Sequence, residues 1–335
     1  METRPYSAVV YAGHACASVL CPALSRPCVR VTTVTQLFAE VARRPNAVAF
    51  IDADLLSRID GEDLEVPVVA IIDEPPAGAR SKTIRLLAAF PWLSHCLSSS
   101  LLKTPLARPH LAMFMDRLFD GSDQRILGNG GVGRVAKIAH AVRRETRFER
   151  MHQFFAKHGL SDRAIASIAD VSEELVMNAL YDAPAEAGYF KAAVPRTEDV
   201  ELPDDYGCEI SYGIEDGNVF VGLRDPFGAF TRERLLEVLN RCNADAVELD
   251  ESRGGAGLGL WRIFSTATTI AITVIPGRLT EFVVRMTVQN GRLVKQLCAV
   301  DLFFAPEPSN DPIDRIKIPT GQDLFETSVT LVLSS

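Results

Sequence analysis

The sequence lacks several features that would point to particular classes of protein. Its seven cysteines are scattered and form no C-x-x-C pair, which argues against a disulfide framework or a structural zinc site. No apolar run approaches the roughly 20 residues that a membrane-spanning helix needs. Basic residues are not in excess either, because 43 acidic against 35 basic residues give a net charge of −8. A general surface for nucleic acid or anionic lipid is therefore not expected.

These absences favour a cytoplasmic protein with reduced thiols and without nucleic-acid or membrane partners. The N-terminal segment is not expected to be a signal peptide, because Glu2 balances Arg4 and His14 interrupts the run of small residues. A length of 335 residues with 47% hydrophobic residues favours about two globular domains. We expect them at residues 1–119 and 135–288, with a glycine-rich linker at 120–134 between them and an extension at 289–335.

Residues 7–118 alternate short apolar runs with helix-like stretches. This alternation predicts an α/β domain with a parallel sheet, helices on both faces and a flavodoxin-like arrangement of five strands. The expected strands lie at 7–11, 28–34, 47–51, 68–72 and 92–97, and the expected helices at 35–43, 81–89 and 109–119.

The order and length of these elements resemble a bacterial response-regulator receiver domain, in which a phosphoacceptor aspartate ends the third strand. Asp52 has that place in AFIDADLL, and Asp54 follows it. The resemblance implies an acidic pair after the first strand, but YAGHA has none, and Lys103 comes later than the family's lysine. We expect a pseudo-receiver in which Asp52 and Asp54 are ordinary strand-end residues, with phosphorylation of Asp52 as the alternative.

The linker contains a literal G-x-G-x-x-G pattern at Gly128, Gly130 and Gly133. A dinucleotide-binding fingerprint needs a strand before it and an acidic residue about 20 positions later. Only 125–127 is available for such a strand, and the sequence after the glycines, AKIAHAVRRETRFERMHQFF, looks helical and charged. A flexible hinge is the preferred interpretation, and a dinucleotide site is the alternative.

From residue 162 the pattern predicts an amphipathic helix. Its apolar stripe consists of Ile165, Ile168, Ala169, Val171, Leu175, Val176 and Ala179. On another face Glu174, Asn178 and Asp182 follow at i, i+4 and i+8, so three oxygen-bearing side chains line up along one side. That arrangement suits a hard cation or an activated water, and the alternative is a solvated helix face.

Two further features follow along the chain. A strand at 219–223 leads to Asp225, on a tight turn that ends at Gly228. After a helix at 231–242, another helix is opened by Gly254, Gly255, Gly257 and Gly259. Glycines before a helix let a phosphate come close to unpaired backbone N–H groups, so a phosphate site is the natural inference.

These segments together resemble the GHKL superfamily of ATP-binding domains, and their layout is most similar to that of the anti-sigma-factor serine kinases. The resemblance rests on ELVMNA at 174–179, DPFG at 225–228 and GAGLGL at 255–260, and it covers about residues 135–288. It implies an α/β two-layer sandwich with a mixed sheet, and a site for ATP and Mg²⁺.

The resemblance also implies a role for each matching residue. Asn178 corresponds to the Mg²⁺ ligand, Glu174 to the catalytic carboxylate, and Asp225 to the acceptor for the adenine amine. Gly228 would let the base approach the turn, and Thr280 belongs to the strand that closes the pocket. The phosphates would be held by Arg253, Gly255, Gly257, Leu258 and Gly259.

Some residues depart from the family's pattern. Phe227 and Ala229 replace two glycines of the turn after Asp225, and the lid segment 241–253 is acidic, which argues against tight capture of a triphosphate. No histidine has the sequence frame of a phosphoacceptor, although His140, expected on a helix, is the best placed.

We therefore expect a bacterial signalling regulator, a protein kinase or ATPase of this class, that binds ATP with Mg²⁺. It would control a protein partner by serine phosphorylation or by nucleotide-gated binding. The alternative is a non-catalytic protein-interaction module with a degenerate nucleotide site. The extension at 289–335 is expected to add edge strands, cover a sheet edge or form a dimer contact, and a homodimer is left open.

Overall fold

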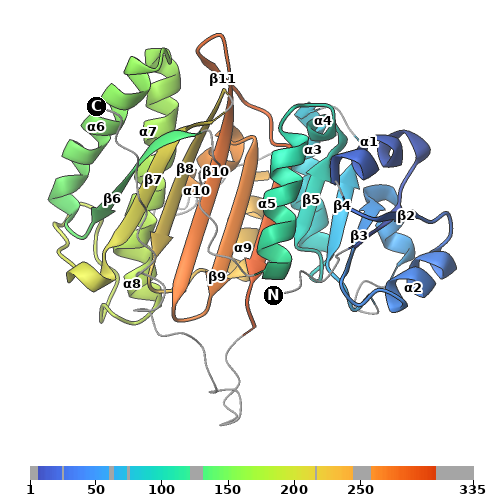
Figure 1. The fold of residues 1–335 in the computed structure, drawn as a ribbon. Helices are drawn as coiled ribbons and strands as arrows, with labels where there is room; N and C mark the ends of the chain where they lie inside the picture. The colour runs from blue at the N-terminus through green and yellow to red at the C-terminus, as the bar shows by residue number, and fades with distance from the viewer. Residues whose placement is uncertain are drawn as a thin grey trace. The chain divides into compact units, whose positions relative to one another are not determined.

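The computed structural model describes residues 7–24, 26–59, 64–73, 76–120, 131–215, 217–243 and 258–306, without the side chains of 14, 76–79, 120, 241–243 and 258. Within these ranges the chain forms one mixed sheet of 12 strands with helices packed on it (Figure 1). The strand order is β2-β1-β3-β4-β5-β12-β9-β10-β8-β7-β6, and β11 pairs with β10. All of these strands belong to one compact unit, Met1–Ala305. The expected α/β class is confirmed.

Five parallel strands form the first half of the sheet, in the order β2-β1-β3-β4-β5 that is typical of flavodoxin-like sheets. They are β1 Ser7–Tyr11, β2 Cys28–Arg30, β3 Ala47–Asp52, β4 Val68–Ile72 and β5 His95–Ser98. The strand expected at 28–34 ends early because Thr33 caps the next helix, where its side chain accepts a hydrogen bond from the N–H of Gln36.

Helices cover both faces of these five strands. One face packs against α1 His14–Leu24, α4 Ser99–Leu102 and α5 Ala107–Asp120, and the other against α2 Val34–Ala42 and α3 Pro76–Ala89. Along β1, Ala8 and Val10 belong to the first apolar cluster, whereas Val9 and Tyr11 belong to the second. Because both faces are buried, these strands are continuous apolar runs in the sequence.

The second half of the sheet is antiparallel. Its strands are β6 Val132–Ile138, β7 Cys208–Glu215, β8 Asn218–Asp225, β9 Thr269–Ile275, β10 Leu279–Gln289 and the short β11 Arg292–Val294. One face packs against α6 Arg144–Lys157, α7 Asp162–Met177, α9 Arg232–Asn243 and α10 Leu258–Thr266. Val221 and Leu223 of β8 share an apolar cluster with Leu175 of α7 and Ile263 of α10.

The strand β12 (Ala299–Phe304) joins the two halves into one sheet. It pairs antiparallel with β5 and parallel with β9. Part of the expected extension at 289–335 therefore lies inside the sheet, and the segments expected as two domains share that sheet. Pairing on both sides of β12 covers the backbone groups that β5 and β9 would otherwise expose as sheet edges.

The start of the second half also differs from the expectation. Residues 132–134, expected in the linker, and 136–138, expected in a helix, all belong to β6. Ala136 and Ile138 face the apolar cluster while Val135 and Lys137 are exposed, so the segment follows the two-residue period of a strand. Gly133 is thus a strand residue, whereas Gly128 and Gly130 lie outside the described residues.

A buried polar group lies where β5 and β12 meet. Asp301 of β12 has its Oδ1 atom 3.3 Å from Nδ1 of His95 and its Oδ2 atom 3.4 Å from Nε2 of His110, which belongs to α5. Burial lowers the pKa of His110, although Asp301 acts in the opposite direction. The contact between the two halves of the sheet therefore contains one carboxylate between two imidazoles.

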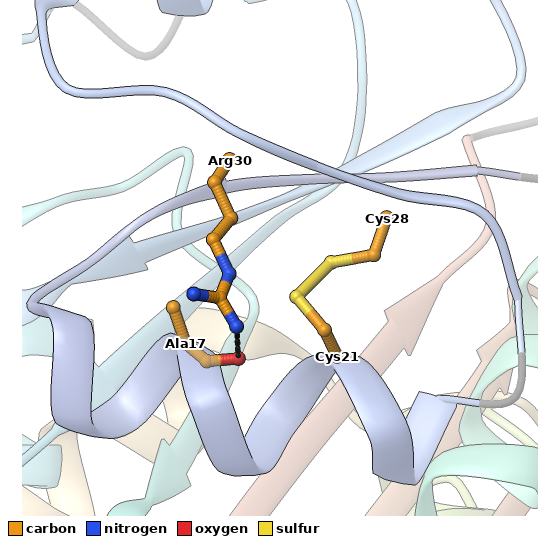
Figure 2. The surroundings of a disulfide bond; sticks show 4 residues. All are labelled: Ala17, Cys21, Cys28 and Arg30. Carbon is orange, nitrogen blue, oxygen red and sulfur yellow. Dashed lines mark hydrogen bonds between the residues drawn. A yellow bond between two sulfur atoms is a disulfide. The ribbon is translucent and has the colours of Figure 1, made fainter.

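A disulfide bond connects the end of α1 to β2. Cys21 and Cys28 are seven residues apart, and the guanidinium of Arg30 donates a 3.2 Å hydrogen bond to the carbonyl of Ala17 beside them (Figure 2). The expectation that all thiols are reduced is wrong for this pair. The search for a C-x-x-C motif did not indicate this pair, because the turn between the helix and the strand places the two cysteines farther apart in the sequence.

Replacing both of these cysteines by serine is expected to lower the free energy of unfolding by about 2.5 kcal/mol, the loop-entropy value for a loop of about eight residues. Urea denaturation under oxidising conditions measures this difference. In reducing buffer the wild type and the double variant should unfold at nearly the same urea concentration. A difference that persists in reducing buffer would instead point to packing of the serine side chains.

Among the described helices, none combines the length and the apolar character needed to cross a membrane.

Candidate functional site

The helix α7 and the π-helical turn that follows it carry the predicted polar side chains. The N-cap of α7 is Ser161, whose hydroxyl accepts a hydrogen bond from the N–H of Ala164. The apolar stripe is buried against the sheet, as the sequence predicts. After Met177 the helix widens into a π-helical turn, Asn178–Asp182, and continues as α8, Ala183–Glu186. Such turns occur often at functional sites, and this one contains two of the three predicted oxygen-bearing residues.

Arg196 brings these three residues together. Its Nη2 atom donates to Oδ1 of Asn178 at 2.8 Å and to Oδ2 of Asp182 at 2.7 Å, and its Nη1 atom donates to Oε2 of Glu174 at 3.2 Å. Burial opposes the charge of Arg196, but Asp182 and Glu174 prevail and raise the pKa of the guanidinium above its ordinary value. The predicted carboxylate face is therefore neither bare nor solvated, because an arginine binds it.

A cavity of about 40 Å³ lies beside this arginine, and five residues predicted for one nucleotide site line it together. They are Glu174, Asn178, Asp225, Gly259 and Thr280. They come from α7, the π-turn, β8, α10 and β10, elements that lie far apart in the sequence. Other lining residues, such as Glu186, Phe230, Arg234 and Phe282, were not singled out from the sequence.

Asp225 ends β8 and is 4% exposed. It is directly opposite Thr280 in the register of β8 and β10, and its Oδ1 atom accepts a 2.9 Å hydrogen bond from the N–H of Phe227. Burial raises the pKa of Asp225 to about 7, and the hydrogen bonds from the backbone of Phe227 and Gly228 only partly oppose it. Near neutral pH this carboxyl group therefore exists in both protonation states.

Gly228 packs against protein rather than lining the cavity. Its φ angle is +58°, and a Cβ atom there would overlap the carbonyl oxygen of Ile275 and lie 2.7 Å from the nitrogen of Arg278. Gly228 thus packs so closely against the turn between β9 and β10 that only a glycine fits at position 228. Phe227 packs beside Tyr189 and Tyr206, with ring centroids 5.9 and 5.7 Å away, and is not among the residues that line the cavity.

Gly259 lets α10 approach α7 closely. A Cβ atom at this position would overlap Oε2 of Glu174. The Glu174 carboxylate thus faces the first turn of α10, where the helix dipole favours a negative charge. Leu258 begins this helix, but Arg253, Gly255 and Gly257, the other residues predicted to hold phosphates, lie outside the described residues.

The oxygens predicted to hold Mg²⁺ are of a type that this ion prefers. Each of them, however, is hydrogen-bonded to Arg196, and no group of three His, Cys, Asp or Glu residues suited to a metal ion occurs in the described part of the chain. As arranged here, Asn178 and its neighbours do not fit a divalent cation.

Three other predicted residues, Asp52, Asp54 and His140, are not among those that line this cavity. Asp52 accepts a 2.7 Å hydrogen bond from the N–H of Gly13, burial raises the pKa of its carboxyl group, and Asp54 forms a 2.9 Å ion pair with Lys82. His140 forms an isolated β-bridge with Glu201 just before a 3-10 turn, and is therefore not on the expected helix. Its Nδ1 atom lies 3.3 Å from Oε1 of Glu201.

Arg196 is a residue of the candidate site that was not predicted from the sequence. It belongs to the segment between α8 and β7, which has no helical or strand period. One signal was available: residues 182–206 contain seven acidic residues and two basic ones, of which Arg196 is the second. An isolated cation in an acidic segment is a candidate for pairing with carboxylates.

The cavity combines carboxylates, of which Asp225 is buried, with two guanidinium groups and an apolar wall, a composition that is common in small-molecule binding sites. Comparison with known proteins adds no family to this description, because no family model matches the chain and no curated protein matches it.

Proposed function

We propose that this chain is a signalling regulator whose second half binds an adenine nucleotide and controls a protein partner. The observation that carries the proposal is the shared cavity of Asn178, Asp225, Gly259 and Thr280. The GHKL resemblance assigns all four to one ATP site, although they come from four separate segments. The sheet β6-β7-β8-β10-β9, with helices packed on one face, also agrees with a two-layer sandwich of GHKL type, although these strands are all antiparallel and only the pairing of β9 with β12 is parallel.

Asp225 gives the site its preference for adenine. An ionised carboxylate only accepts hydrogen bonds, so it can receive the exocyclic amine of adenine, whereas a guanine bound in the same orientation would present its keto oxygen there. A cavity of 40 Å³ has room for a few water molecules rather than a purine ring. Binding therefore requires side chains of the cavity wall, such as Phe230 and Arg234, to move.

The test is titration of a fluorescent ATP analogue. Asp225→Asn keeps the shape of the side chain and an acceptor for Phe227, but it turns the second oxygen into a donor. We expect affinity to fall about tenfold or more, the usual effect of losing a hydrogen bond to a charged group. GTP should compete less well than ATP for the wild type, and this difference should shrink in the variant.

Glu173→Gln is the matched control, because Glu173 is the exposed neighbour of Glu174 on the same helix. It should bind the analogue like the wild type. Equal and negligible binding by the wild type, Asn178→Ala and Asp225→Asn would reject the nucleotide site.

That negative outcome would favour a second candidate, a non-catalytic interaction module that keeps the fold. The contacts of Arg196 with Glu174, Asn178 and Asp182 support it, because they pair the polar groups of the predicted nucleotide site with a side chain of the same protein. If the chain is such a module, ATP should not change its affinity for a protein partner, whereas the first proposal expects that ATP does.

Two exposed tyrosines beside the cavity suit such a partner. Tyr189 and Tyr206 are 43% and 42% exposed, and their ring centroids lie 5.0 Å apart. Both contact Phe227, whose N–H donates a hydrogen bond to Asp225. A protein bound to the two tyrosines would therefore be connected through Phe227 to the carboxylate that is proposed to bind the base. Asp204 and Asp205 precede Tyr206, which favours a basic segment of the partner.

A further inference from the structure

The guanidinium of Arg196 lies where the family resemblance calls for a divalent cation. We propose that Arg196 takes the place of that cation, so that the site needs no metal to receive a phosphate-bearing ligand. The choice of ligand rests on the nucleotide site proposed above, whereas the replacement of the metal by Arg196 does not.

The contact geometry makes the two cations mutually exclusive. Nη2 of Arg196 lies 2.8 Å from Oδ1 of Asn178 and 2.7 Å from Oδ2 of Asp182. Magnesium binds oxygens at about 2.0–2.1 Å in an octahedral arrangement. An ion held by these two oxygens would therefore be in direct contact with the positively charged guanidinium. Either Arg196 or the metal can hold the position, but not both.

Charge and hydrogen bonding also suit an arginine here. Glu174 and Asp182 supply two negative charges, and Arg196 neutralises one of them. A guanidinium has five N–H groups, and the contacts with Glu174, Asn178 and Asp182 use three of them. The Nε–H and one Nη1–H make no hydrogen bond within the described part of the chain, so each can donate to a phosphate oxygen, a ligand that arginine binds well.

Arg196 is held in this position by its own segment. The N–H of Glu198 donates a 2.9 Å hydrogen bond to the carbonyl of Pro195, and the buried hydroxyl of Tyr181 donates a 2.6 Å hydrogen bond to the carbonyl of Glu198. Further along, the N–H of Ala141 donates to the carbonyl of Val200 at 2.8 Å. These bonds fix the backbone next to Arg196, so its guanidinium is preorganised rather than a mobile surface group.

The test is the binding of Mn²⁺, a paramagnetic substitute for Mg²⁺, to the nucleotide-free chain, measured from the EPR signal of the free ion. The wild type and Asn178→Ala should bind Mn²⁺ equally, because Asn178 holds no metal ion in the wild type. Arg196→Ala frees the three oxygens and removes a positive charge, so it should bind one Mn²⁺ at least about tenfold more tightly than the wild type. Adding Asn178→Ala to Arg196→Ala should abolish this gain.

Two further variants serve as controls. Arg196→Lys retains the positive charge and should behave like the wild type, and so should Arg163→Ala, which removes an exposed arginine from the first turn of α7. Circular dichroism checks that each variant is folded. If Arg196→Ala unfolds, Arg196→Met keeps the aliphatic stem and gives the same reading.

Two results would overturn the proposal. Wild-type Mn²⁺ binding that Asn178→Ala abolishes would show that a metal displaces Arg196. A folded Arg196→Ala and Arg196→Met pair without a Mn²⁺ site would show that the guanidinium does not hold a cation position. If the wild type binds the ATP analogue, its affinity should change less than about twofold between EDTA and Mg²⁺. If it binds none, only the nucleotide proposal fails, and the Mn²⁺ titrations still decide the role of Arg196.

Discussion

Replacement of Gly228 by alanine is expected to lower the free energy of unfolding by about 2–5 kcal/mol. The residue has a φ angle of +58°, which costs about 1–2 kcal/mol for a residue with a Cβ atom. Its Cβ atom would also overlap the carbonyl oxygen of Ile275 and lie 2.8 Å from the nitrogen of Gly277. These are backbone atoms that cannot turn away as a side chain can, so overpacking adds about 1–3 kcal/mol.

Gly217→Ala is the matched control for this prediction. Gly217 has a φ angle of +74° in the turn before β8, but a Cβ atom there would meet nothing within 4 Å. Only the backbone strain should appear, so its loss should be about 1–2 kcal/mol. Urea denaturation followed by circular dichroism compares the two variants. Equal losses would show that the turn between β9 and β10 yields to the new methyl group.

The positions of Asn178, Asp225 and Thr280 illustrate what the sequence can predict about this site. The helix that leads to Asn178 follows from its apolar stripe, and the strand that ends at Asp225 from a run of apolar residues. The GHKL resemblance predicts that these segments meet at one site. Asn178, Asp225 and Thr280 do line one cavity. Roles for these residues stay predictions, because their shared location does not show what they bind.

Arg196 and β12 illustrate what the sequence could not predict. Arg196 contacts Asn178 because of the path of an irregular segment, and irregular segments have no period that indicates where a side chain points. β12 is recognisable as strand material, but its insertion between β5 and β9 depends on partners about 200 and 30 residues away in the sequence. Pairing over such distances is set by the whole fold rather than by local pattern.

β6 is a different case, because its signal was present and was outweighed. Ala136 and Ile138 alternate with Val135 and Lys137, the two-residue period of a strand. The charged, helix-forming residues that follow, from Arg143 onward, extended the predicted helix backward over this strand. The structure instead begins α6 at Arg144.

The pH dependence of stability should depend strongly on Asp225. Its pKa is raised from an ordinary 3.8 to about 7 by burial, so the folded state holds a proton that the unfolded chain releases. For an acid with a raised pKa, stability is highest below the ordinary value and is lost as pH rises towards the raised one. A pKa raised from 3.8 to about 7 corresponds to about 4 kcal/mol in total, of which about 2–3 kcal/mol falls between pH 5 and pH 8.

Asp225→Asn removes this titration while keeping an acceptor for the N–H of Phe227. Between pH 5 and pH 8 the wild type should therefore lose about 2–3 kcal/mol of unfolding free energy relative to the variant, measured by urea denaturation at both pH values. Asp204→Asn makes the same chemical change on an exposed turn and should track the wild type. A parallel pH dependence of wild type and Asp225→Asn would mean that the carboxyl group ionises freely, as in an open and hydrated pocket. In that case its high pKa could not limit nucleotide binding. If the predicted loss is observed, affinity for the ATP analogue should increase from pH 6 to pH 8, because only the ionised carboxyl group accepts a hydrogen bond at both oxygens.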